Sequence, residues 1–143
     1  DYRLTPADIT AWEAAHGPIP AGAIVLLRTG WEPRWGDRKA YFGDDPPGDA
    51  THLHCPSFGA DAARWLIEER SIGALGVDTA SIDYGPSSDF AVHRIAAARQ
   101  VPGLENVKNL GGLPARDFWV VALPMNIGGG SGAPLRAIAL VGR

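Results

Sequence analysis

Three stretches of the chain are predicted to form helices. Residues 5–8 suit a helix start, because they offer a capping hydroxyl, a proline at the first helical position and an acid near the positive end of the helix dipole. This first helix is predicted to end before Gly17-Pro18. Residues 59–70 form an amphipathic pattern that predicts a second helix. A third is predicted over residues 90–99, with Asp89 as its cap.

Continuous apolar runs predict the strands. The run at residues 23–27 is expected to be a fully buried strand, and residues 72–77 a second short one. The last two strong strands are predicted at residues 118–123 and 135–141, joined by the glycine-rich residues 128–132. Because strands and helices alternate along the chain, the predicted fold class is α/β.

Residues 31–57 show neither the apolar spacing of a helix nor the apolar run of a strand, and they are predicted to form a long loop. The aromatic side chains of Trp35, Tyr41 and Phe42 alternate there with charges. A loop of this length inside a compact domain is uncommon and is more often functional. These aromatic side chains indicate a flat aromatic substrate.

The composition fits one globular domain over residues 1–143, with 45% hydrophobic and 20% charged residues. The net charge of −3 argues against a nucleic-acid partner, which usually demands a basic face. Cys55 is the only cysteine, so the chain has no internal disulfide and no thiolate metal cluster. No apolar run approaches 18 residues, so we expect no membrane span, and we expect a cytoplasmic location.

His93 and Glu105 are the candidate chemical groups, one on the third predicted helix and one just beyond it. An imidazole and a carboxylate in this arrangement can ligate a divalent metal ion or act as an acid–base pair. Three or four protein ligands are usual, so two cannot close a metal site. The alternatives are a packed core histidine and a solvated loop acid.

Polar residues also follow the ends of two predicted strands. Thr29 and Trp31 follow the first strand, and Asp78 and Thr79 follow the second. In α/β folds ligand groups gather at this edge of the sheet, so these four residues are candidates for substrate binding or for supporting the site. The alternatives are a core aromatic for Trp31 and ordinary loop polarity for Asp78 and Thr79.

Two further features have simpler interpretations. His52 and His54 have the spacing of a metal pair in an extended segment, but two surface histidines are the favoured interpretation. Residues 128–132 could bind an anion through backbone amides, but they match neither a phosphate-binding loop nor a nucleophile elbow. A connection between strands is the simpler interpretation.

Seven groups of short strings, in this order and spacing, resemble the cyclase family of metal-dependent hydrolases, which includes bacterial kynurenine formamidase and isatin hydrolase. The resemblance covers nearly all 143 residues. The strings lie at residues 5–8 with 12–13, 27–31, 62–66, 76–79 with 81–83, 90 with 92–93, 103–106 and 130–134.

The resemblance implies a swivelling β/β/α domain that is incomplete in this chain, a homo-oligomer, and hydrolysis of an amide, formamide or cyclic amide of small size. It matches His93 and Glu105 to the family's two later ligands of Zn or Mn. The family's earlier signature, His-x-Gly-Thr-His-x-Asp-x-Pro-x-His, is not found in this sequence. We therefore expect the other ligands and the catalytic histidine to come from an N-terminal part of the same enzyme. The competing hypothesis is a non-catalytic fragment that binds a ligand or a partner.

Overall fold

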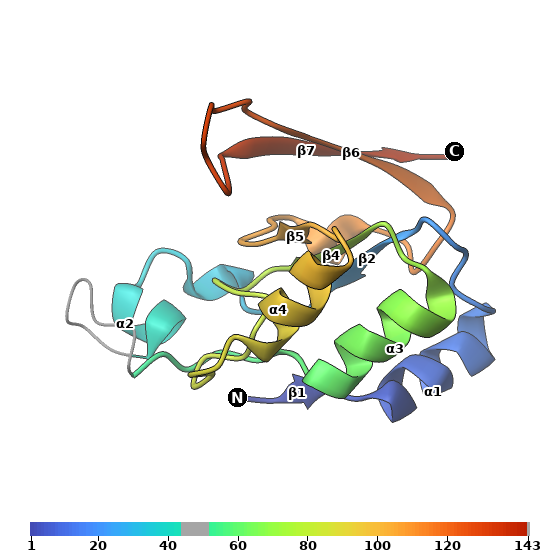
Figure 1. Ribbon diagram of the computed structural model, residues 1–143, viewed down its shortest axis with the longest axis horizontal. Coiled ribbons are helices and arrows are strands. Elements are labelled where there is room, and N and C mark those ends of the chain that lie inside the picture. Colours follow the sequence, from blue (N-terminus) through green and yellow to red (C-terminus); the bar gives the residue numbers. More distant parts are fainter. Residues whose placement is uncertain (44–51, 143) are drawn as a thin grey trace. The chain divides into compact units, whose positions relative to one another are not determined.

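The computed structural model describes residues 1–43 and 52–142 of the chain (Figure 1). It divides into two compact units, Asp1–Gly111 and Gly112–Arg143. Whether both belong to one domain of a larger protein stays a prediction. The elements are β1 (Arg3–Leu4), α1 (Pro6–His16), β2 (Ile24–Leu27), η1 (Glu32–Arg34), α2 (Arg38–Phe42), β3 (Ser57–Phe58), α3 (Ala60–Arg70), β4 (Ala74–Val77), α4 (Ala91–Ala98), β5 (Gly103–Leu104), η2 (Leu110–Gly112), β6 (Phe118–Pro124) and β7 (Leu135–Val141).

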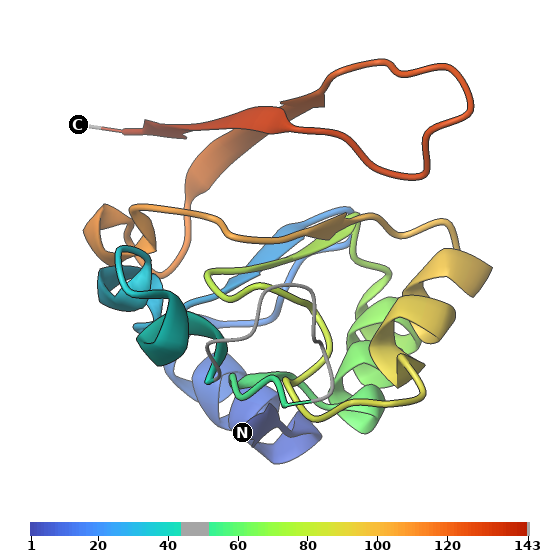
Figure 2. The same cartoon turned by 90° about the vertical axis from the view of Figure 1, so that its left-hand side faces the viewer.

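The first unit is built on a parallel sheet in the order β2-β4-β5. All four residues of the central strand β4 are buried. Helices α1, α3 and α4 lie on one side of this sheet in both views (Figures 1 and 2). Strands β1 and β3 form a second small parallel sheet. A parallel sheet with helices between its strands confirms the α/β class expected from the alternating pattern.

The core of this unit lies between the sheet and its helices. Helix α3 buries Ala62, Ala63, Leu66 and Ile67, which is the face that its amphipathic pattern predicts. These side chains join a cluster with residues of β4 and α4, among them Leu75 and Val92. The helices are therefore fixed against the sheet by apolar contact, and the loops that follow the strands are held on a rigid base.

Two predictions about this unit are wrong. Strand β2 is only half-buried, because it lies at the edge of its sheet and pairs with β4 alone. The segment predicted as one loop contains η1 and the short helix α2. Asp37 caps α2 by accepting a hydrogen bond from Ala40 N at 2.9 Å. The remainder of that predicted loop at residues 44–51 lies outside the described residues.

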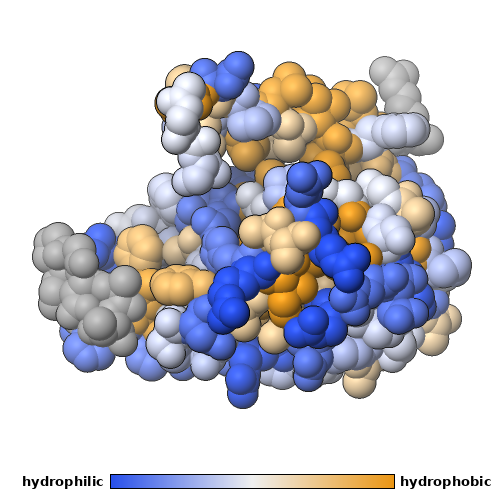
Figure 3. Space-filling model, in the orientation of Figure 1, coloured by the Kyte–Doolittle hydropathy of each residue, from blue (hydrophilic) through white to orange (hydrophobic). Residues whose placement is uncertain are grey.

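The second unit is an antiparallel hairpin of β6 and β7, as predicted, with residues 128–132 in its connection. Trp119 pairs with Leu140 and Val121 with Ile138 on one face. The other face carries apolar pairs too, such as Phe118 with Val141, because successive side chains alternate between faces. Figure 3 shows hydrophobic surface over this hairpin. Among the described residues, no helix is long and apolar enough to cross a membrane.

Candidate metal centre

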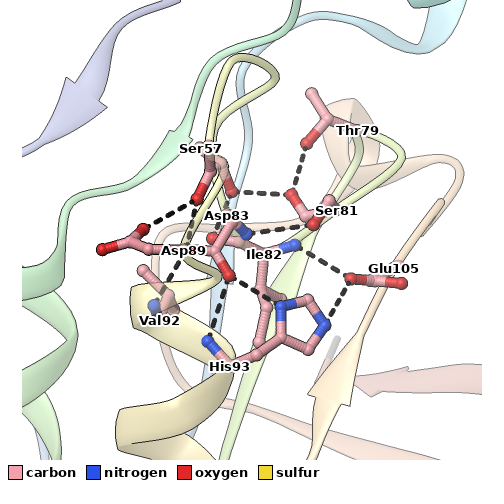
Figure 4. A network of polar contacts seen from close by, with 10 residues as sticks. Ser57, Thr79, Ser81, Ile82, Asp83, Asp89, Val92, His93 and Glu105 are labelled. Atoms are coloured by element: carbon pink, nitrogen blue, oxygen red, sulfur yellow. Dashed lines mark hydrogen bonds and ion pairs between the residues drawn. The ribbon is translucent and has the colours of Figure 1, made fainter. Parts of the chain in front are cut away.

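The structure brings His93 and Glu105 face to face (Figure 4). His93 lies in the first turn of α4, and Glu105 directly follows β5. The imidazole Nε2 is 3.3 Å from Glu105 Oε1, and the two side chains are 45% and 32% exposed. A packed core histidine would exclude solvent, so the exposure favours the interpretation of His93 as a group that meets a ligand.

Asp83, in the turn after β4, holds His93 from the other side. Its Oδ2 accepts from His93 N at 3.1 Å and lies 2.7 Å from the ring Nδ1. Its Oδ1 accepts from Val92 N at 2.8 Å. Since a carboxylate oxygen can only accept, Nδ1 carries the proton, and Nε2 is left to present its lone pair toward Glu105.

The same contacts make Asp83 the cap of α4, so the prediction that Asp89 caps this helix is wrong. Asp89 Oδ1 instead accepts a hydrogen bond from Ser87 Oγ at 3.3 Å. The residue at the N-cap position is Phe90, whose backbone is left-handed at φ 50° and whose side chain cannot cap. The cap is supplied from a different part of the loop, which a search for a polar residue directly before the helix does not find.

Glu105 and the turn after β4 are also fixed by hydrogen bonds. Ile82 N donates to Glu105 Oε1 at 3.0 Å, which holds the oxygen that faces His93. Ser57, which is 1% exposed, donates from its hydroxyl to the carbonyls of Ser81 at 2.8 Å and Ile82 at 2.7 Å. The two candidate ligands are therefore presented by anchored backbone rather than by a free loop.

The donor set fits a divalent metal ion. Imidazole nitrogen and carboxylate oxygen are both ligands of Zn²⁺, and two such ligands at about 2.0–2.2 Å from one tetrahedral ion lie about 3.3–3.5 Å apart. The observed separation of His93 Nε2 and Glu105 Oε1 is 3.3 Å. Within the described part of the chain, no group of three or more His, Cys, Asp or Glu residues could hold a metal ion. The described residues therefore supply two candidate ligands.

Three of the four predicted substrate-binding residues, Thr29, Trp31 and Asp78, come together at the sheet edge. Asp78 Oδ1 accepts from Thr29 N at 2.9 Å and from Thr29 Oγ1 at 2.6 Å. Its Oδ2 accepts from Gly30 N at 2.9 Å and from Trp31 N at 3.1 Å. Asp78 is 4% exposed, so its carboxylate shapes the loop after β2. Whether Thr29, Trp31 or Asp78 contacts a substrate stays a prediction.

Thr79, the fourth of these residues, points inward. Its side chain is fully buried, and its hydroxyl donates to the Ser81 carbonyl at 3.2 Å. In this position the hydroxyl stabilises the turn that carries Asp83. Its predicted contact with a substrate has no support in this geometry.

Tyr41 links this loop to the segment that follows Glu105, a role that no sequence pattern indicated. Trp31 Nε1 donates to the Tyr41 carbonyl at 2.8 Å. The Tyr41 hydroxyl donates to Asn106 Oδ1 at 2.6 Å and lies 3.3 Å from the Asp78 carbonyl. Burial is the main cause that raises the pKa of Tyr41 to about 12, so the hydroxyl stays a donor at ordinary pH.

A pocket of about 190 Å³ opens beside Asp83. Apolar and aromatic side chains make up much of its wall, including Phe42, Leu53, Tyr84 and Phe90. A second pocket of about 170 Å³ lies beside Asp78 and Asn106. Tyr41 lines both pockets, Phe42 lines the first and Trp35 lines the second. Whether they meet a flat aromatic substrate stays a prediction.

The remaining candidates are surface or buried structural groups. His52 and His54 are exposed, as the favoured interpretation expected, and His54 Nδ1 lies 2.7 Å from Asp1 Oδ2. Cys55 is buried, and burial raises the pKa of its thiol, which makes it a poor nucleophile.

The fold is that of a cyclase-type α/β protein. The Cyclase family model, described as "Putative cyclase", matches residues 1–84, and the chain belongs to this family. The resemblance found in the sequence is thereby confirmed.

The relatives of this chain include hydrolases. Isatin hydrolase of Roseibium aggregatum is 36% identical over 145 residues, which covers 99% of this chain and 53% of that protein. Isatin hydrolase A from Ralstonia solanacearum matches with a TM-score of 0.90 and 40% identity over 99% of this chain and 54% of its own. A structure named as a potential metal-dependent hydrolase with cyclase activity matches with a TM-score of 0.69 and 25% identity, over 98% of this chain and 58% of its own. The chain thus spans about half the length of these relatives.

Proposed function

We propose that the protein carrying this chain is a metal-dependent hydrolase of amide bonds, including cyclic amides. The observation that carries the proposal is the facing pair of His93 Nε2 and Glu105 Oε1, 3.3 Å apart and held from behind by Asp83. The names of the relatives support it, since two are isatin hydrolases and a third is named as a metal-dependent hydrolase. The metal would be Zn or Mn.

Each residue has a part in this proposal. His93 and Glu105 would hold the ion. A bound divalent ion of this kind activates water and polarises a carbonyl group. Asp83 holds the ring by its Nδ1, which would leave Nε2 free to bind the ion, and the loop of Thr29 and Trp31 would shape the wall of the substrate site.

The remaining ligands and the general acid–base group would come from protein outside residues 1–143. Two ligands bind a metal ion weakly, since three or four are usual. We propose that they lie in the N-terminal part of the same enzyme, on a separate chain or in a preceding segment, and that the enzyme forms a homo-oligomer. The whole would act on a small-molecule amide.

The test is to express the protein from its gene, including any segment that is encoded outside residues 1–143. The purified protein is analysed for Zn and Mn and assayed with isatin, following the loss of its absorbance. We expect stoichiometric metal, hydrolysis of isatin, loss of activity with a chelator and recovery with the metal. The 143-residue chain alone is the control and should hold less metal and show no turnover.

The outcomes separate the parts of the proposal. Hydrolysis that persists after complete removal of metal would refute the metal requirement. A protein that binds metal stoichiometrically but opens neither isatin nor other small amides would favour the non-catalytic, ligand-binding alternative. Full activity of the 143-residue chain alone would refute the need for further ligands.

A further inference from the structure

Glu105 is the first residue beyond the paired part of strand β5. The strand is two residues long, and its last pair joins Leu104 to Gly76 of β4. Glu105 follows directly, and its side chain points to His93 (Figure 4). The pairing of the strands ends one residue before the candidate ligand, so it does not by itself set the direction of Glu105.

Asn106 turns the chain back at this point. In a parallel pair of strands, the bonds of one strand advance along the other in the same direction. Here Asn106 N donates to the Thr79 carbonyl at 2.8 Å. The next residue, Val107, donates to the earlier Val77 carbonyl at 3.0 Å. The backbone of Asn106 is left-handed, with φ 56°, and this reversal sets the course of the chain on the far side of Glu105.

The side chain of Asn106 is held by a buried tyrosine. Its Oδ1 accepts a hydrogen bond from the Tyr41 hydroxyl at 2.6 Å, and Tyr41 is 2% exposed. Tyr41 is fixed in turn, because its carbonyl accepts from Trp31 Nε1 at 2.8 Å and its hydroxyl lies 3.3 Å from the Asp78 carbonyl. The turn after Glu105 is therefore tied to a buried residue from a distant part of the sequence.

Asparagine satisfies both demands of position 106. It is one of the few residues with a side chain that tolerate left-handed backbone, and its amide oxygen can accept the bond from Tyr41. Asn109 has the same kind of backbone, with φ 65°, but it bonds to Glu32 through its backbone N at 2.8 Å. The two asparagines share the backbone conformation, and the bond to Tyr41 belongs to Asn106.

We propose that Asn106 is a positioning residue for the metal ligand Glu105. Its bond to Tyr41 holds the turn that directs the carboxylate toward His93. This inference rests on the proposed function, in which Glu105 binds the ion, and it adds a residue on which the geometry of that ligand depends. A carboxylate that is already held in place does not have to be ordered when the ion binds, so the contact strengthens metal binding.

The test measures metal affinity and stability in the protein that includes any segment encoded outside residues 1–143. Asn106→Gly removes the acceptor but suits left-handed backbone. The lost bond and the relieved backbone oppose each other, so the thermal midpoint of the metal-free protein should stay within about 3 °C of the parent. The dissociation constant for Zn²⁺, from competition with a chromophoric chelator, should rise about tenfold. Asn109→Gly is the matched control, because it relieves the same kind of backbone without touching the bond to Tyr41, and it should leave this constant unchanged.

Two further substitutions test whether Asn106 acts through Tyr41. Asn106→Asp keeps an acceptor oxygen and tolerates left-handed backbone. It should match or exceed the parent's affinity for Zn²⁺, because its charge also attracts the cation. Tyr41→Phe removes the donor and should weaken Zn²⁺ binding as much as Asn106→Gly does. The two changes together should cost no more affinity than either alone, since both break the same bond.

Unchanged Zn²⁺ affinity in Asn106→Gly, with a parent protein that binds the ion, would reject the positioning role and leave the proposed function standing. Losses that add up in the double variant, or an equal loss in Asn109→Gly, would also overturn the role. A larger fall in the metal-free thermal midpoint of Asn106→Gly would assign the asparagine to the stability of the fold instead. A parent protein that binds no metal rejects both the role and the proposed function.

Discussion

The carboxylate of Asp83 binds both the backbone amide and the ring Nδ1 of His93, at 3.1 and 2.7 Å from one oxygen. One side chain therefore starts helix α4 and sets the tautomer of the imidazole. The start of the helix and the orientation of the candidate ligand depend on the same buried group.

Asp83→Asn separates these two effects. Asparagine still caps helices well, so we expect little loss of stability. Its amide nitrogen can replace the oxygen that faces Nδ1, which favours the other tautomer and removes Nε2 as a ligand. The metal affinity of the complete protein should fall about 10- to 100-fold, measured by competition with a chromophoric chelator. Asp89→Asn is the matched control, because Asp89 lies in the same loop and accepts from Ser87, not from His93, within the described part of the chain.

His93→Ala should abolish stoichiometric metal binding and leave the fold intact. The side chain is 45% exposed, so its removal opens no cavity in the core. Metal content by elemental analysis and the thermal midpoint of the metal-free protein are the measurements. His54→Ala removes another exposed histidine, paired with Asp1, and should change neither. A folding defect with unchanged metal content would instead indicate a structural histidine.

Glu105→Gln tests the second ligand. The glutamine oxygen can still accept from Ile82 N, so the segment after β5 should keep its place. The carboxylate charge is lost, and we expect weaker binding of a divalent ion by at least about tenfold in the same competition assay. Unchanged affinity would show that the contact between His93 and Glu105 is a simple ion pair.

Asp78→Ala should be one of the most destabilising changes in the first unit. It leaves four donors from Thr29, Gly30 and Trp31 without their acceptor in a site where Asp78 is 4% exposed. Each buried donor left without an acceptor costs about 1–3 kcal/mol, so we expect a loss of at least roughly 3 kcal/mol in the free energy of unfolding, read from urea denaturation. Asp61→Ala, at an exposed position of the first turn of α3, should cost less than about 1 kcal/mol.

Tyr41 should make the fold sensitive to alkali. Its pKa is raised from 10.0 to about 12 in the folded chain, so the folded state binds more protons than the unfolded state between these values. Stability from this group is therefore fully present below pH 10 and declines as the pH rises toward 12. Tyr41→Phe should be less stable at neutral pH, because the bond to Asn106 is lost, and should show a weaker decline above pH 10. An identical alkaline decline in both proteins would contradict this.

Much of this fold follows from local patterns. Helix α3 and the strands of the hairpin appear where the period of apolar residues places them. The two-residue strands do not, because they exist only through distant partners: Arg3 pairs with Ser57, and Gly76 with Leu104. No short stretch of the sequence contains both residues of such a pair.

The same distinction applies to the site. His93 and Glu105 were found from their residue types and from a family resemblance. Asp83 was not, since its ten-residue distance from His93 matches no helical or strand period. A search for an acid able to accept the first free amides of α4 would have found it. Tyr41 was noted only as one of several aromatic residues. Its linking role gave no signal, because its bonds to Asn106 and Trp31 are made only after folding.

The hairpin of β6 and β7 has a practical consequence for anyone who handles this polypeptide. An antiparallel sheet that faces water usually has one polar face. This hairpin has Trp119 and Leu140 on one face and Phe118 and Val141 on the other. Both strands are also edge strands, whose unpaired backbone N–H and C=O groups can pair with a neighbouring molecule. Preparations of residues 1–143 by themselves should therefore self-associate as their concentration rises, and mild detergent should keep them dispersed.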